Sequence, residues 1–333
     1  MYQQIMIINL AEEERKSILQ RWGNAHVVEA VQQALTGAGF TCRSIAANAP
    51  SDMSSIRGSE GLAFPNARYF PQPHQYLSDI LDDWGIPYIG SGRSGHENCN
   101  KFVMKTRLRA AGIPTPKFQL LGHPAEAELI AHIDGPYVLK PCTAAASLGV
   151  VRAASVQSAS EAAAQLGVRF GWPVLVEAWE RYREFTVATL GDGGQWHAFP
   201  VEIVVPSSAG YLTEEVKRLQ LAGAAETIEP VVDIGLCHDL TALARHTAEV
   251  LDIRDYARME ILLNAAGQLL VIDVNTLPGL RQHSYLPMCL SVNVGFDFTE
   301  AVLSVVAAAH LRLNISLGPP LADIWGRLAA YSG

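Results

Sequence analysis

Segments with the periodicity of a strand alternate with segments with the periodicity of a helix along most of the chain, and this alternation limits the fold more than any other feature. Residues 5–10 form an apolar run typical of a first strand. Residues 25–35 follow with helical spacing, with Asn24 as the expected N-cap and Gly37 or Gly39 at the end. The sequence therefore predicts an α/β fold with partly parallel sheets that begins with a doubly wound domain.

The turn between this first strand and helix excludes one common function. It has no Gly-x-Gly-x-x-Gly, which dinucleotide-binding domains place there to hold a pyrophosphate, so a dehydrogenase is disfavoured. A Gly- and Pro-rich stretch at residues 85–93 marks a domain boundary near residue 93. The elements expected after it are a helix at 101–111, strands at 137–140, 173–179 and 184–190, and a helix at 239–251.

Composition narrows the class of protein. A chain of 333 residues that is 49% hydrophobic can bury a sizeable core, and at about 150 residues per domain it holds two or three domains. A net charge of -8 disfavours a general binder of nucleic acid or anionic membranes. The five cysteines lack any Cys-x-x-Cys spacing, and no apolar run approaches the roughly 18 residues that span a bilayer. We expect a soluble, unprocessed, cytoplasmic protein.

A predicted hairpin carries a polar face. Alternation over residues 256–263 and 269–275 groups six side chains on one side, namely Tyr256, Arg258, Glu260, Val271, Asp273 and Asn275. The segment 264–267 supplies turn chemistry between the two strands. If Leu263 pairs with Gln268, Arg258 lies opposite Asp273. The same register places Glu260 opposite Val271.

The polar face of this hairpin suits a divalent metal. Glu260 and Asp273 supply carboxylates and Asn275 an amide oxygen, which are the hard ligands that Mg²⁺ prefers. Phosphate oxygens and water would complete the octahedron. The alternative is a solvated sheet face with a cross-strand pair between Arg258 and Asp273.

Segments before and after the hairpin favour phosphate chemistry. Gly279 follows the acidic strand and can present a backbone N–H to a developing oxyanion. Upstream, a strand ending in Lys140 leads into a loop of small residues that contains Ser147, and such a loop can close over phosphates. Two further strands place Glu177 with Trp179, and Glu184, where they could bracket an adenosine.

In this order the segments resemble the D-alanine–D-alanine ligase branch of the ATP-grasp superfamily, from residue 85 to near residue 313, about two-thirds of the chain. The motifs that carry the resemblance are Lys101-x-x-x-Lys105, Leu139-Lys-Pro, Ser147-Leu-Gly-Val, Val176-Glu, Arg183-Glu-Phe-Thr-Val, Tyr256-Ala-Arg-Met-Glu and Ile272-Asp-Val-Asn-Thr-Leu-Pro-Gly. The resemblance implies a two-lobed ATP-grasp fold after an N-terminal α/β domain. The expected parts are 1–93 (N-terminal domain), 94–179 (central lobe), 180–316 (C-terminal lobe with the metal site) and 317–333 (tail).

The resemblance also implies roles for individual residues. The residues expected at ATP are Lys101, Lys140 and Ser147 at the phosphates, Glu177 and Trp179 at the adenine, and Glu184 at the ribose. Glu260, Asp273 and Asn275 are expected to bind Mg²⁺ or Mn²⁺. Arg258 and Gly279 are expected to stabilise the oxyanion, and Lys217 lies on an expected flap over the γ-phosphate.

The family motifs for the first substrate are altered in this chain. Residues 64–75 lack the family's His-Gly-x-x-Gly-Glu-Asp-Gly, and Arg68 stands at its histidine. The phosphate loop reads Ala145-Ala-Ser-Leu-Gly without the family's first serine, and Arg218 replaces the flap tyrosine. Any of Glu12, Glu13 and Glu14 could take the place of the N-terminal glutamate. The altered motifs favour a first substrate other than D-alanine.

The stretch for the second substrate is kept. Ser284 stands at the family serine that contacts the substrate carboxylate, and His283 beside it is a further candidate contact. Arg68 and Arg218 could meet an anionic first substrate, although each could equally be an ordinary surface arginine.

These matches and losses predict an ATP-dependent ligase of specialised, natural-product metabolism. It would phosphorylate a first substrate at a carboxylate or an enol or keto oxygen and join it to the amine of an amino acid, releasing ADP and phosphate. The alternatives are a D-alanine–D-alanine ligase of cell-wall synthesis, an L-amino-acid dipeptide ligase and a nucleotide-binding protein without turnover. A homodimer is expected. The identity of the first substrate, the chirality of the amino acid, and an amide or imine product stay open.

Overall fold

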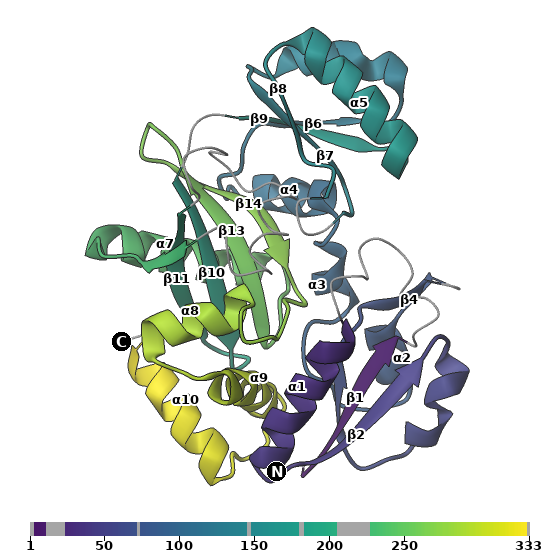
Figure 1. Cartoon of the computed structure of the whole chain (residues 1–333), viewed down its shortest axis with the longest axis vertical. Coiled ribbons are helices and arrows are strands. Elements are labelled where there is room, and N and C mark those ends of the chain that lie inside the picture. Colours follow the sequence, from purple (N-terminus) through teal and green to yellow (C-terminus); the bar gives the residue numbers. More distant parts are fainter. Residues whose placement is uncertain are drawn as a thin grey trace.

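The computed structural model describes the chain in six stretches: residues 3–10, 24–71, 74–144, 148–179, 183–204 and 227–331. The strands of these stretches form four sheets, which confirms the predicted α/β class. In Figure 1 the sheet of β6 to β9 lies at the top, the largest sheet below it, and the N-terminal sheet at the lower right. The domain boundaries expected at residues 93, 179 and 316 stay predictions.

The N-terminal sheet is parallel, with β1 at its centre in the order β2-β1-β3. Its part of the chain contains β1 (Gln4–Leu10), α1 (Asn24–Gly37), β2 (Thr41–Ala47), η3 (Pro50–Ile56), β3 (Leu62–Pro65), β4 (Tyr69–Pro71), β5 (His74–Tyr76) and α2 (Leu77–Asp83). Ile5 and Ile7 of β1 pack with α1, whereas Met6 and Ile8 pack with α2 on the opposite face. Because both faces are covered, the central strand is apolar throughout its middle, as in a doubly wound domain.

The central sheet is antiparallel, in the order β6-β9-β7-β8. Its part of the chain contains α3 (Arg93–Glu97), α4 (Lys101–Ala110), β6 (Phe118–Leu121), η4 (Pro124–His132), β7 (Tyr137–Pro141), β8 (Val151–Ala153), α5 (Val156–Phe170) and β9 (Val174–Ala178). Leu139 and Val176 pack against α5 on one face. Residues of opposite parity, such as Lys140 and Glu177, therefore point to the other face, toward the largest sheet.

The largest sheet is antiparallel, in the order β12-β11-β10-β13-β14. Its part of the chain contains β10 (Arg183–Gly191), β11 (Trp196–Val204), β12 (Thr227–Pro230), α7 (Ile234–Val250), β13 (Tyr256–Leu263), β14 (Leu269–Asn275), α8 (Tyr285–Val294), α9 (Phe298–Arg312) and α10 (Pro319–Tyr331). Val187 and Met259 pack with α7 on one face. Ala188 and Leu190 pack with α8 and α9 on the other.

Two elements differ from their prediction. Helix α7 begins at Ile234, before the predicted start at residue 239, because Asp233 accepts a hydrogen bond from the N–H of Leu236 as its N-cap. The chain does break after Leu317, but the expected tail is a helix, α10, whose Leu321 lies in the same core as α9.

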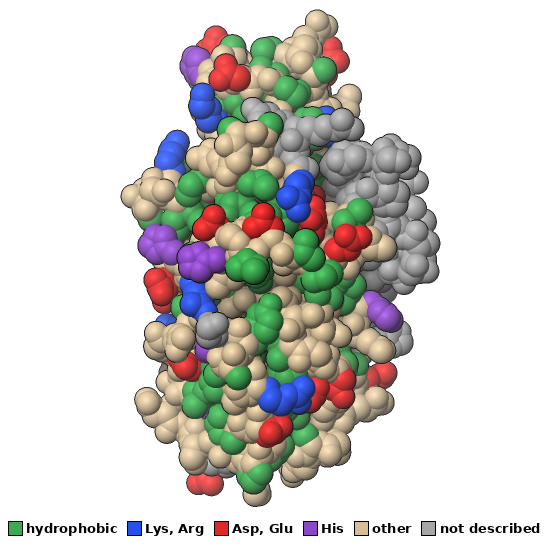
Figure 2. Space-filling model, turned by 90° about the vertical axis from the view of Figure 1, so that its left-hand side faces the viewer, with side chains coloured by type: hydrophobic (Ala, Val, Ile, Leu, Met, Phe, Trp, Pro, Cys, Tyr) green, Lys and Arg blue, Asp and Glu red, His purple; other side chains and the backbone are tan. Residues whose placement is uncertain are grey.

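The distribution of charged side chains on the surface agrees with the acidic composition. On the face in Figure 2, Lys and Arg side chains are scattered among Asp and Glu side chains. Among the described residues no single helix is long and apolar enough to cross a membrane. Helices α8 and α9 would reach that length only together, and they meet at 100°.

A buried ion pair joins the end of the N-terminal part to the largest sheet. Asp255, just before β13, accepts bonds from Arg312 Nε (2.5 Å), Arg312 Nη2 (2.9 Å) and the N–H of Gly90 (2.6 Å). The same guanidinium donates to the carbonyl of Tyr88 at 2.7 Å. Asp255 is fully buried and left-handed, with φ of 59°. The pair therefore connects Tyr88–Gly90, β13 and α9, through both the carboxylate and the guanidinium.

We predict that Asp255→Asn destabilises the protein by about 3 kcal/mol, because Arg312 is left as a buried, unpaired charge. Asparagine tolerates the left-handed backbone, so the variant changes the charge and not the conformation. Urea unfolding measures the difference. Asp134→Asn, which breaks the exposed pair with Lys117, is the control and should leave the free energy of unfolding unchanged. Equal stability of the two variants would contradict the proposed connection.

Candidate functional site

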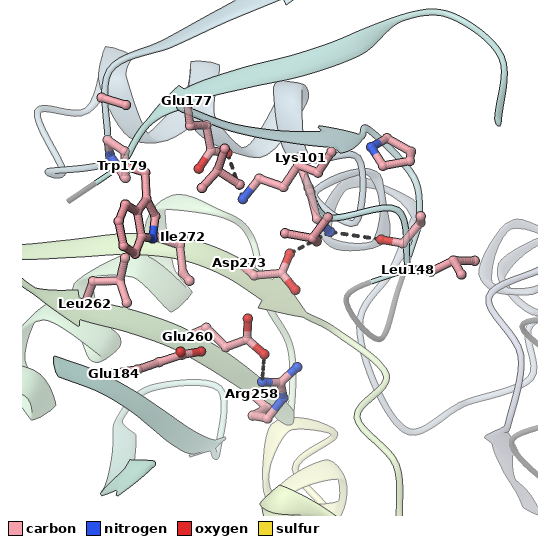
Figure 3. Close-up of a pocket in the computed structure, with 17 residues that line it drawn as sticks. Lys101, Leu148, Glu177, Trp179, Glu184, Arg258, Glu260, Leu262, Ile272 and Asp273 are labelled. Atoms are coloured by element: carbon pink, nitrogen blue, oxygen red, sulfur yellow. Dashed lines mark hydrogen bonds and ion pairs between the residues drawn. The ribbon is translucent and has the colours of Figure 1, made fainter. Parts of the chain in front are cut away.

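A cleft between the central sheet and the largest sheet collects most of the predicted residues (Figure 3). Eight of them line it: Lys101, Lys140, Glu177, Trp179, Glu184, Arg258, Glu260 and Asp273. They come from α4, β7, β9, β10, β13 and β14, and the residue just after β9, so no single segment of sequence forms the cleft. Their roles stay predictions, but the structure places them on facing walls of one cavity.

One end of the cleft is apolar. Val138, Leu262 and Ile272 line it together with the ring of Trp179, which in Figure 3 lies beside Leu262 and Ile272. The guanidinium of Arg152 lies 3.1 Å from the centroid of the Trp179 ring. Apolar side chains with a few polar groups at the rim suit a planar heteroaromatic ring. Adenine fits this end.

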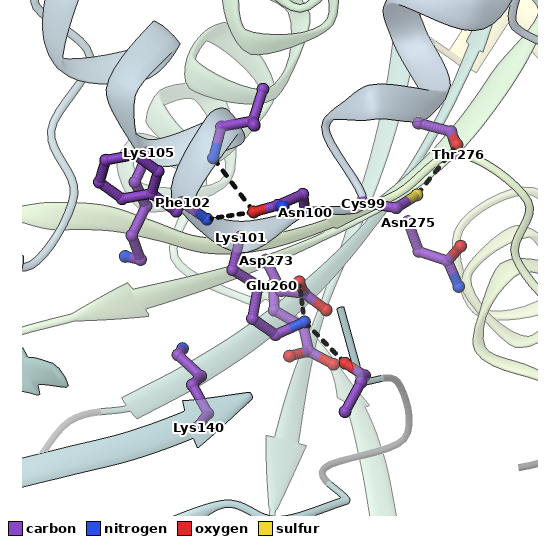
Figure 4. Close-up of polar contacts among 12 residues, drawn as sticks. Cys99, Asn100, Lys101, Phe102, Lys105, Lys140, Glu260, Asp273, Asn275 and Thr276 are labelled. Carbon is purple, nitrogen blue, oxygen red and sulfur yellow. Dashed lines mark hydrogen bonds and ion pairs between the residues drawn. The ribbon is translucent and has the colours of Figure 1, made fainter. Parts of the chain in front are cut away.

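The other end carries buried cations. Lys140 Nζ lies 2.8 Å from Glu177 Oε1, and Lys105 Nζ lies 3.3 Å from the same oxygen. Lys101 Nζ lies 3.0 Å from Asp273 Oδ1 and donates to the carbonyl of Ala144 at 3.1 Å (Figure 4). Glu177 thus holds two lysines, in addition to its predicted place at the adenine. Ammonium groups at this end fit the phosphates of a nucleotide.

Lys105 is a site residue to which sequence reasoning gave no role. It is fully buried between Glu177 and the hydroxyl of Thr115, to which it donates at 2.7 Å. The spacing from Lys101 could have indicated it. Residues four apart share a face of a helix, and Lys101 was already expected at the phosphates. Burial lowers the pKa of Lys105 to about 8, although Glu177 acts to raise it.

The hairpin register differs from the predicted one. Leu263 pairs with Leu269, Glu260 lies opposite Asp273, and Arg258 lies opposite Asn275. A β-bulge at Glu260–Ile261 puts one extra residue on β14, so the pairing changes along the strand. The prediction that Arg258 faces Asp273 was therefore wrong, and so was the placement of Val271, which points into the core behind the sheet.

The bulge aligns the two carboxylates. Glu260 and Asp273 are direct cross-strand partners on the cleft side, and each has a cation beside it. Arg258 Nη1 lies 2.6 Å from Glu260 Oε1, and Lys101 holds Asp273. Burial acts to raise the pKa of Asp273, but Lys101, Arg258 and Lys140 together hold it below its ordinary value. Asp273 is therefore ionised at neutral pH and can bind a cation.

The donor set fits Mg²⁺ through Glu260 and Asp273. Among the described residues no group of three His, Cys, Asp or Glu surrounds a metal position, so phosphate and water would supply the remaining ligands. Asn275 Oδ1 already accepts bonds from Arg68 Nη2 (2.5 Å) and the N–H of Leu277 (3.1 Å). An amide oxygen has two lone pairs, so Asn275 would have to release one bond to hold a metal.

Residues predicted for the second substrate lie at the end of β14. A Cβ at position 279 would lie 2.9 Å from Ser284 Oγ, so a larger residue there would force the Ser284 side chain to shift. Ser284 precedes α8 and accepts a bond from the N–H of Arg281 at 3.3 Å. The guanidinium of Arg258 lies 5.3 Å from the ring of Tyr285, the next residue. Gly279 and Ser284 are thus neighbours, and Arg258 lies beside the residue that follows Ser284; the roles expected for them stay predictions.

Other predicted residues fall elsewhere. Lys217, Arg218, Ser147, Glu12, Glu13 and Glu14 lie outside the described residues. His283 is exposed, and it lines a groove with Ala34 of α1 and Phe298 of α9 instead of the cleft, because the turn before α8 directs it outward. The structure therefore does not bring His283 to the site.

A buried histidine that the sequence did not indicate lies beneath Asn275. His96 Nδ1 is 2.7 Å from Thr276 Oγ1, and Cys99 Sγ lies 3.3 Å from the same hydroxyl. Burial and the charge of Arg68 lower the pKa of His96 to about 3, so it is neutral. No spacing pattern in the sequence connects residues 96 and 276. Their contact supports the end of β14 from the N-terminal side.

Comparison with known proteins agrees with this geometry. The family model described as "D-ala D-ala ligase C-terminus" matches residues 108–307. The D-alanine–D-alanine ligase of Ectopseudomonas mendocina is 30% identical over 238 residues, which cover 69% of this chain and 72% of that protein. The solved D-alanine–D-alanine ligase of Bacillus anthracis with ATP has a TM-score of 0.73 at 18% identity, covering 93% and 99% of the two chains. The VanG D-Ala:D-Ser ligase of Enterococcus faecalis has a TM-score of 0.72 at 18% identity, covering 93% and 100%.

The lowered pKa of Lys105 makes the free energy of unfolding depend on pH in a way that can be tested. An unfolded lysine has a pKa near 10.4, so between pH 8 and pH 10 the unfolded state binds more protons than the folded state. Stability should therefore rise with pH in this range. We predict that Lys105→Met reduces the rise from pH 7.5 to pH 9.5, measured by urea unfolding, by an amount on the order of 1 kcal/mol. Exposed Lys117→Met is the control, and equal pH slopes for all three proteins would contradict the burial effect.

Proposed function

This chain belongs to the D-alanine–D-alanine ligase family of the ATP-grasp superfamily and is an ATP-dependent, ADP-forming carbon–nitrogen ligase, and we propose that it joins two amino acids. D-Alanine is the first candidate for both positions, because the matched family and relatives carry that name. The comparisons favour this alternative over the specialised-metabolism function predicted from the altered motifs, for which they offer no support. A homodimer and a cytoplasmic location stay predictions.

The observation that carries the proposal is the facing pair Glu260 and Asp273, at one wall of a cleft whose other wall carries Lys140. We assign the apolar end near Trp179 to adenine and the lysines to the phosphates. We assign the two carboxylates to a magnesium ion, which would neutralise charge on the phosphoryl group being transferred.

The reaction needs two steps. A carboxylate oxygen of the first amino acid attacks the γ-phosphorus of ATP, the bond to the β-phosphate oxygen breaks, and ADP leaves. The amine of the second amino acid then attacks the resulting acyl phosphate, loses a proton and expels inorganic phosphate. Arg258 and the N–H of Gly279 would stabilise the negative charge that develops on the carbonyl oxygen in this second step. Ser284 would hold the carboxylate of the second amino acid.

A second candidate is a ligase that activates a first substrate other than D-alanine. Arg68 favours it, because this guanidinium stands at the family's histidine and contacts Asn275 at the end of β14. The loss of the surrounding first-substrate motif points the same way.

We predict that Glu260→Gln and Asp273→Asn each reduce ADP release at least about 100-fold. Each variant removes a charged ligand of the magnesium ion, which would neutralise the charge of the phosphates. Turnover is measured by coupled ADP detection at saturating ATP. Glu202→Gln on β11, which β10 separates from β13 in the same sheet, breaks an exposed pair with Arg183 and serves as the control. Retained turnover in both site variants would refute the metal assignment.

The substrates can be identified by ADP release against D- and L-amino acids, singly and in pairs. We expect D-alanine alone to support turnover and to yield the dipeptide, identified by mass spectrometry. Turnover that requires a different first amino acid would favour the second candidate. ATP hydrolysis without any amino acid, or with no joined product, would exclude the ligase proposal.

A further inference from the structure

Arg68 brings a guanidinium from the N-terminal part of the chain to the end of β14. It lies between β3 and β4, is half-buried, and donates from Nη2 to Asn275 Oδ1 at 2.5 Å. Asn275 is the cross-strand partner of Arg258, and Glu260 and Asp273 form the next pair on the same side of the hairpin. Arg68 therefore contacts the cross-strand pair next to the one that carries the two carboxylates of the cleft.

The charge of Arg68 is not matched within the described residues. Three other cations of this region have carboxylate partners: Arg258 pairs with Glu260, Lys101 with Asp273, and Arg312 with Asp255. Arg68 has no ion pair with a described Asp or Glu, and its buried Nε has no hydrogen-bond partner there. Its one described side-chain partner is the neutral amide of Asn275.

The groups around Arg68 do not supply a negative charge. His96, whose pKa is lowered to about 3, is a neutral imidazole. Burial raises the pKa of Tyr256, so its phenol keeps its proton. A half-buried guanidinium with an unused donor is an unfavourable arrangement unless an anion completes it.

We propose that Arg68 binds the reacting carboxylate of the first substrate. The assignment rests on the proposed ligase function, which requires a carboxylate beside the γ-phosphate. A carboxylate accepts two parallel bonds from a guanidinium and carries a full charge, so it is a better partner than the amide of Asn275. The position next to Asn275 and Arg258 places it where phosphoryl transfer would occur and not at the adenine end.

In the first step, Arg68 orients the carboxylate while one of its oxygens attacks the γ-phosphorus. After transfer the same guanidinium faces the acyl phosphate, whose phosphoryl oxygens keep a negative charge. The release of Arg68 from Asn275 Oδ1 also frees a lone pair on that oxygen. Binding of the first substrate would thereby make Asn275 available as a ligand.

The test isolates the first step in the full-length enzyme. Hydroxylamine replaces the second amino acid and traps the acyl phosphate as a hydroxamate, which is measured by colour with ferric iron. The variants are Arg68→Gln and Arg68→Lys. The matched control is Arg43→Gln, an exposed arginine of the N-terminal sheet that contacts Ser55.

We expect Arg68→Gln to lower kcat/KM for the first amino acid about 100-fold, as the loss of an active-site cation does. Arg68→Lys should recover part of the loss because it keeps the charge without the planar fork. The KM for ATP should stay within about twofold, and Arg43→Gln should behave as the wild type. The loss should be equal for D-alanine and for D-aspartate, since both carry the reacting carboxylate.

Three results would overturn the assignment. Unchanged hydroxamate kinetics in Arg68→Gln would show that Arg68 does not touch the substrate. A parallel loss of ATP affinity, with no rescue by lysine, would show a structural role. A loss confined to D-aspartate would assign Arg68 to a side-chain carboxylate. If the wild type forms no hydroxamate with any amino acid, the ligase proposal itself fails and Arg68 loses its substrate with it.

Discussion

Two carboxylates facing each other across a hairpin are the arrangement on which the rest of this site depends. Like charges directly opposite on neighbouring strands repel, so Glu260 and Asp273 need compensation. Arg258 and Lys101 provide it, each within 3.0 Å of one carboxylate. Lys101 and Arg258 also hold the pKa of Asp273 below its ordinary value, so this carboxyl is ionised at neutral pH. A metal ion could then replace Arg258 and Lys101 beside the two carboxylates, while the phosphates pair with the released cations. The net charge of the cleft would change little.

The neighbouring elements hold this arrangement in place. Glu177 of the opposite wall lies within 3.3 Å of both Lys105 of α4 and Lys140 of β7, so it holds these two cations in place. The buried pair of Asp255 and Arg312 ties the start of β13 to the end of the N-terminal part. These charged groups connect the N-terminal part to the largest sheet, and so help to fix the position of Arg68 relative to β14.

Sequence periodicity predicted which side chains of one strand share a face of the hairpin, but not the register in which the two strands pair. Arg258 and Glu260 share a face because alternation within one strand is a local property. The bulge that aligns Glu260 with Asp273 depends on how two strands meet, so the register was predicted wrongly and Val271 was placed in the cleft. The contact between His96 and Thr276 joins residues far apart in sequence and left no local signal. His283 shows the same limit. It is adjacent to Ser284 in sequence, but this does not fix the direction of its side chain, which lies outside the cleft.

We propose that the carboxylate cluster directs phosphoryl transfer from ATP to a substrate carboxylate, and that an amine then displaces inorganic phosphate from the acyl phosphate. The most direct measurement is ³¹P NMR of the phosphate released when D-alanine labelled with ¹⁸O in its carboxylate is the first substrate. Attack by a carboxylate oxygen predicts one ¹⁸O atom in each phosphate, since the oxygen that attacks phosphorus leaves with it. Turnover that releases only unlabelled phosphate would mean that water is the acceptor, and would contradict the account.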